Sequence, residues 1–108
     1  MVVHRWVIEL IPEAEAELKA IPADIRARFI HISGMIAESG PHHVGMPHVR
    51  HLEGRPWEMR MKGRDGIARA VYVAQHGCRL TVIHVFAKKT QKTPRRAIEI
   101  AMNRMRTL

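Results

Sequence analysis

The sequence predicts an α+β fold, in which helices pack on a mostly antiparallel sheet. Three observations favour this class. Residues 12–39 have the apolar spacing of helices, residues 56–87 alternate apolar and polar side chains with a period of two, and residues 94–106 return to helical spacing. Separate runs of helices and strands are typical of α+β domains. Because 108 residues is the length of one ordinary domain, we expect residues 1–108 to form a single domain.

The first part of the chain predicts a strand and then a helical hairpin. Residues 2–10 are rich in Val, Ile and Trp, which strands favour. Pro12 suits the first turn of a helix, and the acidic residues that follow it suit the same turn. A second helix is predicted for residues 23–39. Its apolar side chains form one stripe that we expect to pack on the sheet, namely Ile25, Phe29, Ile32 and Ile36.

The middle of the chain predicts an antiparallel meander of three or four strands. Residues 57–62 place Trp and Met on one face and charged side chains on the other. A turn sequence separates this strand from a second predicted strand, residues 67–75. Another turn separates the second strand from a third, residues 78–87. A short edge strand around residues 46–52 would be the fourth.

The last element is a predicted helix over residues 94–106. Thr93-Pro94 is typical of a helix start, and the helix carries an apolar stripe made of Ile98, Ala101, Met102 and Met105. We expect the helices to cover one face of the sheet. The other face, which bears Arg60, should then be partly open.

The chain is strongly basic. Its 18 Lys and Arg against 10 Asp and Glu give a formal net charge of +8 and a pI near 10.8. Such an excess favours polyanionic partners, with nucleic acid first. The apolar runs are too short for a membrane span, and the N-terminus lacks the layout of a signal peptide, so we expect a cytoplasmic protein without a membrane partner. Cys78 is the only cysteine, which suits a reducing compartment.

Conventional cofactor and metal motifs are missing. There is no glycine-rich phosphate loop and no zinc-type cysteine pattern. Four histidines gather in one short segment but lack the spacing of a metal site; they are His42, His43, His48 and His51. We therefore expect no metal and no cofactor. His84 lies in the middle of a predicted strand, where it is either a core histidine or, if its face is the open one, a site residue.

Two arginines stand inside apolar strands, where charge is depleted. Arg60 and Arg69 each need a carboxylate, water or an anionic ligand, because burying an isolated guanidinium is costly. Glu58 is a nearby carboxylate, but it cannot neutralise both. We therefore expect at least one of the two to bind phosphate, which the planar guanidinium contacts through two hydrogen bonds.

A second basic group surrounds the start of the last helix. It consists of Lys88, Lys89, Lys92, Arg95 and Arg96. Free N–H groups at a helix start favour anions, so cations crowded there become favourable when a phosphate binds. The alternative is an ordinary solvated charge run. Because this basic group is close to the predicted open face of the sheet, we favour an anion-binding role for it.

The sequence from Leu52 to Met105 resembles the RelE/ParE/HigB superfamily of toxins, and within it the phage-derived, HigB-like (Tad-type) branch. The resemblance is carried by Leu52-Glu53-Gly54, by Trp57-Glu58-Met59-Arg60, by Arg69 with Tyr72, by the segment AKKTQKTP with the preceding Phe86, and by Ile98 and Ala101. The segment KKTQKTP is specific to that branch. Before residue 52, only the order of strand and helices agrees.

The resemblance implies the toxin of a type II toxin–antitoxin system. Its expected activity is that of a metal-independent endoribonuclease (mRNA interferase) that cuts mRNA in the 30S A site of the ribosome and blocks translation. The expected partner is a helix-turn-helix antitoxin, and the toxin alone is expected to be a monomer.

Combining the resemblance with the charge pattern gives the expected site. The expected catalytic residues are Arg60, Arg69, Lys88, Lys89 and His84, and the expected substrate-binding residues are Lys92, Arg95, Arg96, Phe86 and Tyr72. Because arginine is a poor proton carrier, we expect the arginines to stabilise charge in the transition state. A lysine or His84 would move protons if its pKa suits the task.

Two alternative functions stay open at this point. One is a ParE-like protein that inhibits DNA gyrase by protein contact, and the other is a nucleic-acid-binding domain without enzymatic activity. An adjacent reading frame for a helix-turn-helix protein would favour a toxin over the binding domain.

Overall fold

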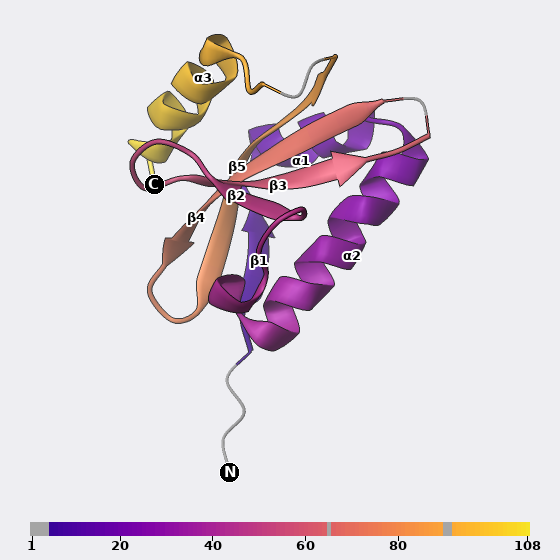
Figure 1. Ribbon diagram of the computed structural model, residues 1–108. Coiled ribbons are helices and arrows are strands. Elements are labelled where there is room, and N and C mark those ends of the chain that lie inside the picture. The colour runs from indigo at the N-terminus through magenta and orange to yellow at the C-terminus, as the bar shows by residue number, and fades with distance from the viewer. Residues whose placement is uncertain (1–4, 65, 90–91) are drawn as a thin grey trace.

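The computed structural model describes residues 5–64, 66–89 and 92–108. The elements in chain order are β1 (Val7–Leu10), α1 (Pro12–Ala20), α2 (Ala23–Ser39), the short 3₁₀ helix η1 (Pro41–His43), β2 (Val49–His51), β3 (Trp57–Lys62), β4 (Ile67–Gln75), β5 (Arg79–Lys88) and α3 (Arg95–Met105). This order, drawn in Figure 1, confirms the predicted α+β class. Residues 2–4 of the predicted first strand, Asp65 of a predicted turn and Thr90-Gln91 of the KKTQKTP segment lie outside the described residues.

The strands form one sheet in the order β1-β5-β4-β3-β2. Strands β2 to β5 pair antiparallel, as predicted for the meander, while β1 pairs parallel with β5. In this register Arg60 lies directly opposite Arg69, and Arg69 lies directly opposite Phe86. Three side chains that were predicted to be functional therefore form one row across three neighbouring strands.

One face of the sheet is covered by α2. The predicted stripe of α2 is buried there, with Phe29 and Ile32 packed in the same cluster as Met59 and Met61 of β3. Helix α1 packs mainly on β5, beyond the point where β1 ends. The prediction for the face of α2 that packs on the sheet is confirmed.

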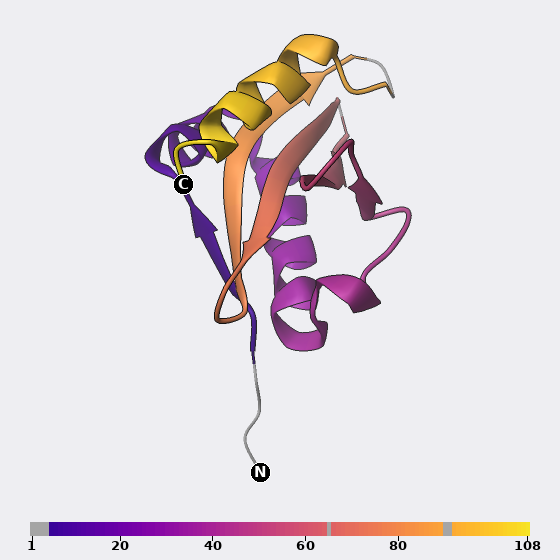
Figure 2. The same ribbon diagram turned by 90° about the vertical axis from the view of Figure 1, so that its left-hand side faces the viewer.

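The opposite face carries α3. Ala101 and Met105 of this helix pack with Val71, Val73 and Ile83 in a second apolar cluster. Figure 2 shows α2 and α3 on opposite sides of β4 and β5. The expectation that the helices share one face was therefore wrong, because α2 already occupies the first face and the apolar stripe of α3 needs its own surface.

Helix α3 begins beside β5. The part of the same sheet face that lies over β3 is left uncovered, and Arg60 is half-buried there. No helix within the described residues is long and apolar enough to cross a membrane.

The packing of α2 can be tested with two isoleucines on the same helix. Ile32 is 1% exposed, whereas Ile30 is 70% exposed. Ile32→Val should lower the free energy of unfolding by about 1 kcal/mol, because it removes one buried methylene group. Ile30→Val is the matched control and should change it by less than about 0.5 kcal/mol. Urea denaturation measures both, and equal losses would contradict the assigned face.

Candidate functional site

The row of Arg60, Arg69 and Phe86 follows from the pleat of the strands. Side chains alternate along a strand, so Met59 and Met61 enter the core beneath α2 while Glu58 and Arg60 emerge on the face of α3. The same alternation directs Arg69 to this face, between Arg60 and Phe86. Two guanidinium groups and an aromatic ring thus lie side by side beside the start of α3.

A buried carboxylate holds this face together. Glu58 is fully buried, and its Oε1 lies 3.7 Å from Nε of Arg69, which is only 2% exposed. The same oxygen lies 3.6 Å from Nε of Arg50 on β2. The hydroxyl of Thr93 donates a hydrogen bond of 2.8 Å to Oε2 of Glu58. The predicted alternative, that Glu58 pairs with a strand arginine, is confirmed for Arg69, and Glu58 also fixes the segment that leads into α3.

Lys88 lies at the end of β5 on the same face and is 8% exposed. Burial lowers the pKa of its ammonium group from 10.5 to about 8, and the positive charge of Arg69 adds to this effect, while Glu58 partly opposes it. An amine with this pKa exists in both protonation states near neutral pH. Lys88 is therefore suited to proton transfer, unlike an exposed lysine.

The site carries an excess of positive charge. Burial lowers the pKa of the Arg69 guanidinium; Glu58 opposes this change, whereas the neighbouring Arg60 and Arg50 reinforce it. Arginine nevertheless stays protonated at neutral pH. Four cationic side chains thus surround one carboxylate, an arrangement that favours binding of an anion.

The other predicted residues are placed differently. Lys89, Lys92 and Arg96 are exposed around the end of β5 and the start of α3. Arg95 forms ion pairs with Glu53, at 2.6 Å, and with Glu99, at 3.8 Å, so its charge is largely compensated by the protein itself.

Tyr72 is not brought to this face. It is buried in the cluster beneath α2, because positions 68, 70 and 72 of β4 point away from the face that Arg69 occupies. Burial also raises the pKa of its hydroxyl group. Tyr72 is therefore a core residue, and of the two aromatic residues predicted to bind substrate, Phe86 is the one that lies on the face of Arg69.

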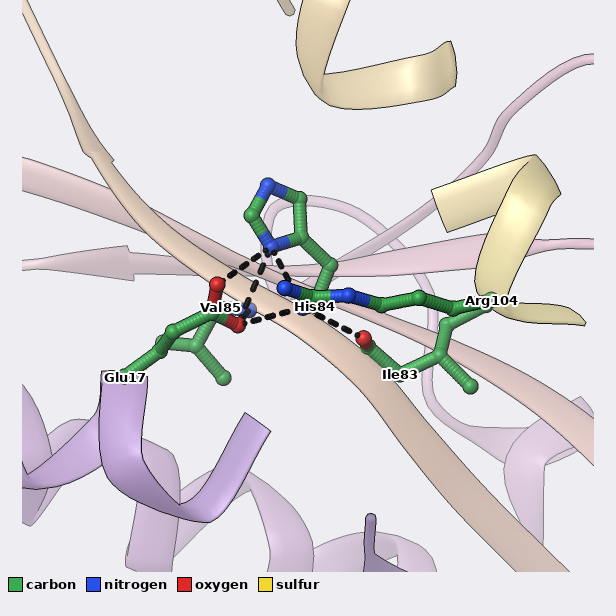
Figure 3. A network of polar contacts seen from close by, with 5 residues as sticks. All are labelled: Glu17, Ile83, His84, Val85 and Arg104. Atoms are coloured by element: carbon green, nitrogen blue, oxygen red, sulfur yellow. Dashed lines mark hydrogen bonds and ion pairs between the residues drawn. The ribbon is translucent and has the colours of Figure 1, made fainter. Parts of the chain in front are cut away.

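His84 shares the face but is held by a network that joins α1, β5 and α3 (Figure 3). Its Nδ1 lies 3.0 Å from Oε1 of Glu17, and Arg104 donates to the same oxygen at 2.8 Å. Glu17 also accepts the backbone N–H of Val85 at 3.0 Å. The ring of His84 stacks on Phe86 with centroids 4.9 Å apart. His84 thus orients Phe86 and helps to join three elements.

Glu17 is central to this network. Burial opposes ionisation of its carboxyl group, but hydrogen bonds from Arg104, Val85 and His84 outweigh burial and hold its pKa below the usual 4.5. A lowered carboxyl pKa stabilises the fold above pH 4.5, and that stability is lost as the pH falls through the lowered value.

Glu17→Gln should therefore lower the free energy of unfolding at pH 7 by about 1–2 kcal/mol, the range for a lost charged hydrogen bond at a partly exposed site. The difference from the wild type should shrink as the pH falls below 4.5, where the wild-type carboxyl also becomes neutral. Urea denaturation at pH 7 and pH 3 measures both values. Glu15→Gln on the same helix is the control, since Glu15 is exposed and pairs with the exposed Lys19. A loss independent of pH would show that packing, not charge, explains the effect.

Three residues of this region were not found from the sequence. Arg50 lies in the short edge strand, which was predicted only as a possible strand around residues 46–52. Its position opposite Glu58 follows once β2 pairs with β3. Thr93 was noted as a helix start and not as a partner of Glu58. Glu17 lies 67 residues from His84, and no local pattern joins them.

Potential metal ligands are not gathered in the part of the chain that the structure describes: no group of three or more His, Cys, Asp or Glu side chains is placed to hold an ion. The chemistry that the described site offers is charge stabilisation by arginine, proton transfer by Lys88 and stacking on Phe86.

Comparison with solved structures shows the same fold in toxins. The E. coli toxin RelE, solved as an arginine double mutant in the free state, is 19% identical with a TM-score of 0.67, and the match covers 94% of this chain and 98% of that chain. A chain of the Mycobacterium tuberculosis toxin–antitoxin complex RelBE2 is 13% identical with a TM-score of 0.58, covering 82% and 98%. A chain of the RelE–RelB complex from Pyrococcus horikoshii OT3 is 16% identical with a TM-score of 0.57, covering 77% and 94%.

Among curated protein sequences, none is significantly similar to this chain. A family model gives the sharper result. The family described as Phage derived protein Gp49-like (DUF891) matches residues 16–106. This match and the shared RelE fold confirm the resemblance to the phage-derived branch of the RelE/ParE/HigB superfamily, and the chain belongs to the Gp49-like family.

Proposed function

We propose that this protein is the toxin of a type II toxin–antitoxin pair and acts as a metal-independent endoribonuclease on ribosome-bound mRNA. The observation that carries the proposal is the row of Arg60, Arg69 and Phe86 beside the buried amine of Lys88 at the end of β5. The fold shared with RelE supports the toxin class. The site combines the groups that a ribose 2′-hydroxyl needs in order to attack the adjacent phosphate.

In the proposed reaction, the guanidinium groups of Arg60 and Arg69 bind the non-bridging phosphate oxygens and stabilise the added negative charge of the phosphorane. The neutral amine of Lys88 accepts the proton of the 2′-hydroxyl as its oxygen bonds to phosphorus. The bond from phosphorus to the 5′-oxygen breaks, and that oxygen takes a proton from water. The products are a 2′,3′-cyclic phosphate and a 5′-hydroxyl, and Phe86 positions the neighbouring base by stacking.

The proposed partner is an antitoxin that covers the basic face. Two of the structures with this fold are complexes of RelE with RelB or of the RelBE2 pair, which supports an antitoxin partner. The exposed Lys89, Lys92 and Arg96 would dock the RNA backbone in the absence of the antitoxin.

The decisive experiment is to induce the protein in cells with and without its neighbouring antitoxin and to map mRNA 5′ ends. We expect growth arrest with new 5′ ends within reading frames, abolished by the antitoxin. Arg69→Lys keeps the positive charge but removes the paired hydrogen bonds, and it should remove the new ends. Arg106→Ala, an exposed arginine near the C-terminus, is the control. Arrest without new 5′ ends but with inhibited DNA gyrase would instead establish the ParE-like alternative.

A further inference from the structure

A basic cavity adjoins the proposed site at the outer edge of the sheet. It has a volume of about 670 Å³ and lies between the first half of α2, the segment before β2 and the turn from β3 to β4. Cavities of roughly 300–1,000 Å³ are typical of small-ligand sites. Arg60 and Arg69 line this cavity as well as the proposed catalytic row, so the two spaces are continuous.

The walls of this cavity are positively charged. Its cationic side chains are Arg28, Arg60, Lys62, Arg64 and Arg69. They face one carboxylate, Asp24, which accepts the backbone N–H of Arg64 at 2.7 Å. That hydrogen bond holds the pKa of Asp24 below its usual value although burial opposes it, so the carboxylate stays ionised and is already committed to the turn. Arg69 is also paired with Glu58 at 3.7 Å, so two carboxylates offset part of the charge of the five cations, and a positive excess is left for an anionic ligand.

Two histidine rings supply a different kind of contact. His31 of α2 and His48 of the segment before β2 line the cavity, with ring centroids 6.5 Å apart and planes at 78°. Ile32, Pro47 and Met61 give apolar contacts next to them. Proteins recognise unstacked RNA bases by stacking them on such rings and by hydrogen bonding to their edges. The cavity thus combines cations for a phosphate with rings for a base.

We infer that this cavity binds the RNA nucleotide adjacent to the scissile phosphate and sets the base preference of the cut. The inference rests on the proposed endoribonuclease function and adds a specificity subsite formed by α2. Arg60 and Arg69 hold the scissile phosphate from one side, and the chain of the RNA continues past them into the cavity. His31 and His48 contact the base, and Arg28 contacts the next phosphate.

The test is a titration with a single-stranded pentaribonucleotide that carries one 2′-deoxy residue, so that it binds without being cut there. The ring signals of the histidines are followed by NMR, and affinity is measured in parallel. We expect the signals of His31 and His48 to shift and that of His76, at the exposed turn between β4 and β5, to stay in place. The double variant His31→Ala/His48→Ala should bind about tenfold more weakly, as for loss of a stacking contact.

The matched control is His43→Ala/His76→Ala, which removes two exposed histidines outside the cavity and should leave affinity within about twofold. Arg28→Ala should lower the slope of log affinity against log salt by about 0.7, the value of one phosphate contact. Thermal melts show whether each variant is folded. In cells, the His31/His48 double variant should still cut mRNA but with a flatter base preference around the mapped ends.

Unchanged signals of His31 and His48 at saturating RNA would overturn the inference, as would equal affinities of the two double variants. If an acidic peptide shifted these signals and the RNA did not, the cavity would be a protein-binding surface, and the inference would be wrong. Failure of the proposed function has a separate signature, since the wild type would then produce no new mRNA ends although the oligonucleotide still shifted His31 and His48.

Discussion

Lys88→Met is expected to lower the rate of RNA cleavage by about a hundredfold to ten-thousandfold, the range for loss of a positioned general base. The buried amine has a pKa of about 8, so about a tenth of it is neutral at pH 7. The wild-type rate should rise with pH and level off above pH 8. Lys88→Arg keeps the charge but does not titrate in this range, and it should be as inactive as Lys88→Met. Cleavage of a short RNA between pH 6 and pH 9 measures the profile.

Measurements of stability against pH distinguish the loss of a general base from the loss of folding. Because the folded-state pKa of Lys88 lies below the usual 10.5, the unfolded chain binds the proton more tightly between pH 8 and pH 10.5. The Lys88 contribution to wild-type stability should therefore rise with pH across that window, and Lys88→Met should lose this rise while staying folded. Lys19→Met, on an exposed lysine of α1, is the control. A wild-type rate independent of pH between 6 and 9, or an active Lys88→Met, would exclude Lys88 as the base.

Glu58→Gln is expected to lower the free energy of unfolding by about 3–5 kcal/mol, the usual cost of removing one partner of a buried ion pair. The substitution retains the shape of the side chain, but it leaves the buried guanidinium of Arg69 facing a neutral amide instead of a carboxylate. Glu53→Gln is the matched control, because Glu53 pairs with Arg95 at the surface and should cost less than about 1 kcal/mol. Urea denaturation at pH 7 measures both.

A double variant tests whether charge is the cause. Adding Arg69→Met to Glu58→Gln removes the buried positive charge as well, so the loss should be smaller than the sum of the two single losses by at least about 1 kcal/mol. Additive losses would show that Glu58 and Arg69 contribute to stability independently, and the role given to their ion pair would be wrong.

Much of the fold was predictable because the local patterns are strong. Strict alternation predicted the bounds of β3, the turn sequences on either side predicted those of β4, and the apolar stripe of α2 predicted its buried face. The face taken by α3 was not predictable in this way, since an amphipathic helix indicates only that it needs some apolar surface. The parallel partner of β1 depends on the path of two helices, which no short pattern specifies.

The site was predictable in part. Arg60 and Arg69 were visible as charges inside apolar strands, but their direct pairing depends on the register of the hairpin. The alternation of side chains along β4 already places Arg69 and Tyr72 on opposite faces of the sheet. The resemblance placed both in the site, so for Tyr72 the alternation was the better guide. The lowered pKa of Lys88 was not predictable, because it depends on burial and on neighbours from other strands.

The Glu17 network has a consequence for how the sheet can be extended. Where β1 ends, β5 would present bare backbone groups that could template a strand of another chain. Three of these groups are already taken: the carbonyl of Val82 by the N–H of Ile11, the carbonyl of Ile83 by Arg104, and the N–H of Val85 by Glu17. The donors and the acceptor come from the link between β1 and α1, from α3 and from α1, so a strand added to β5 beyond the end of β1 would have to displace these three bonds. The edge strands of the sheet, β1 and β2, are then the places where a partner chain could add a strand.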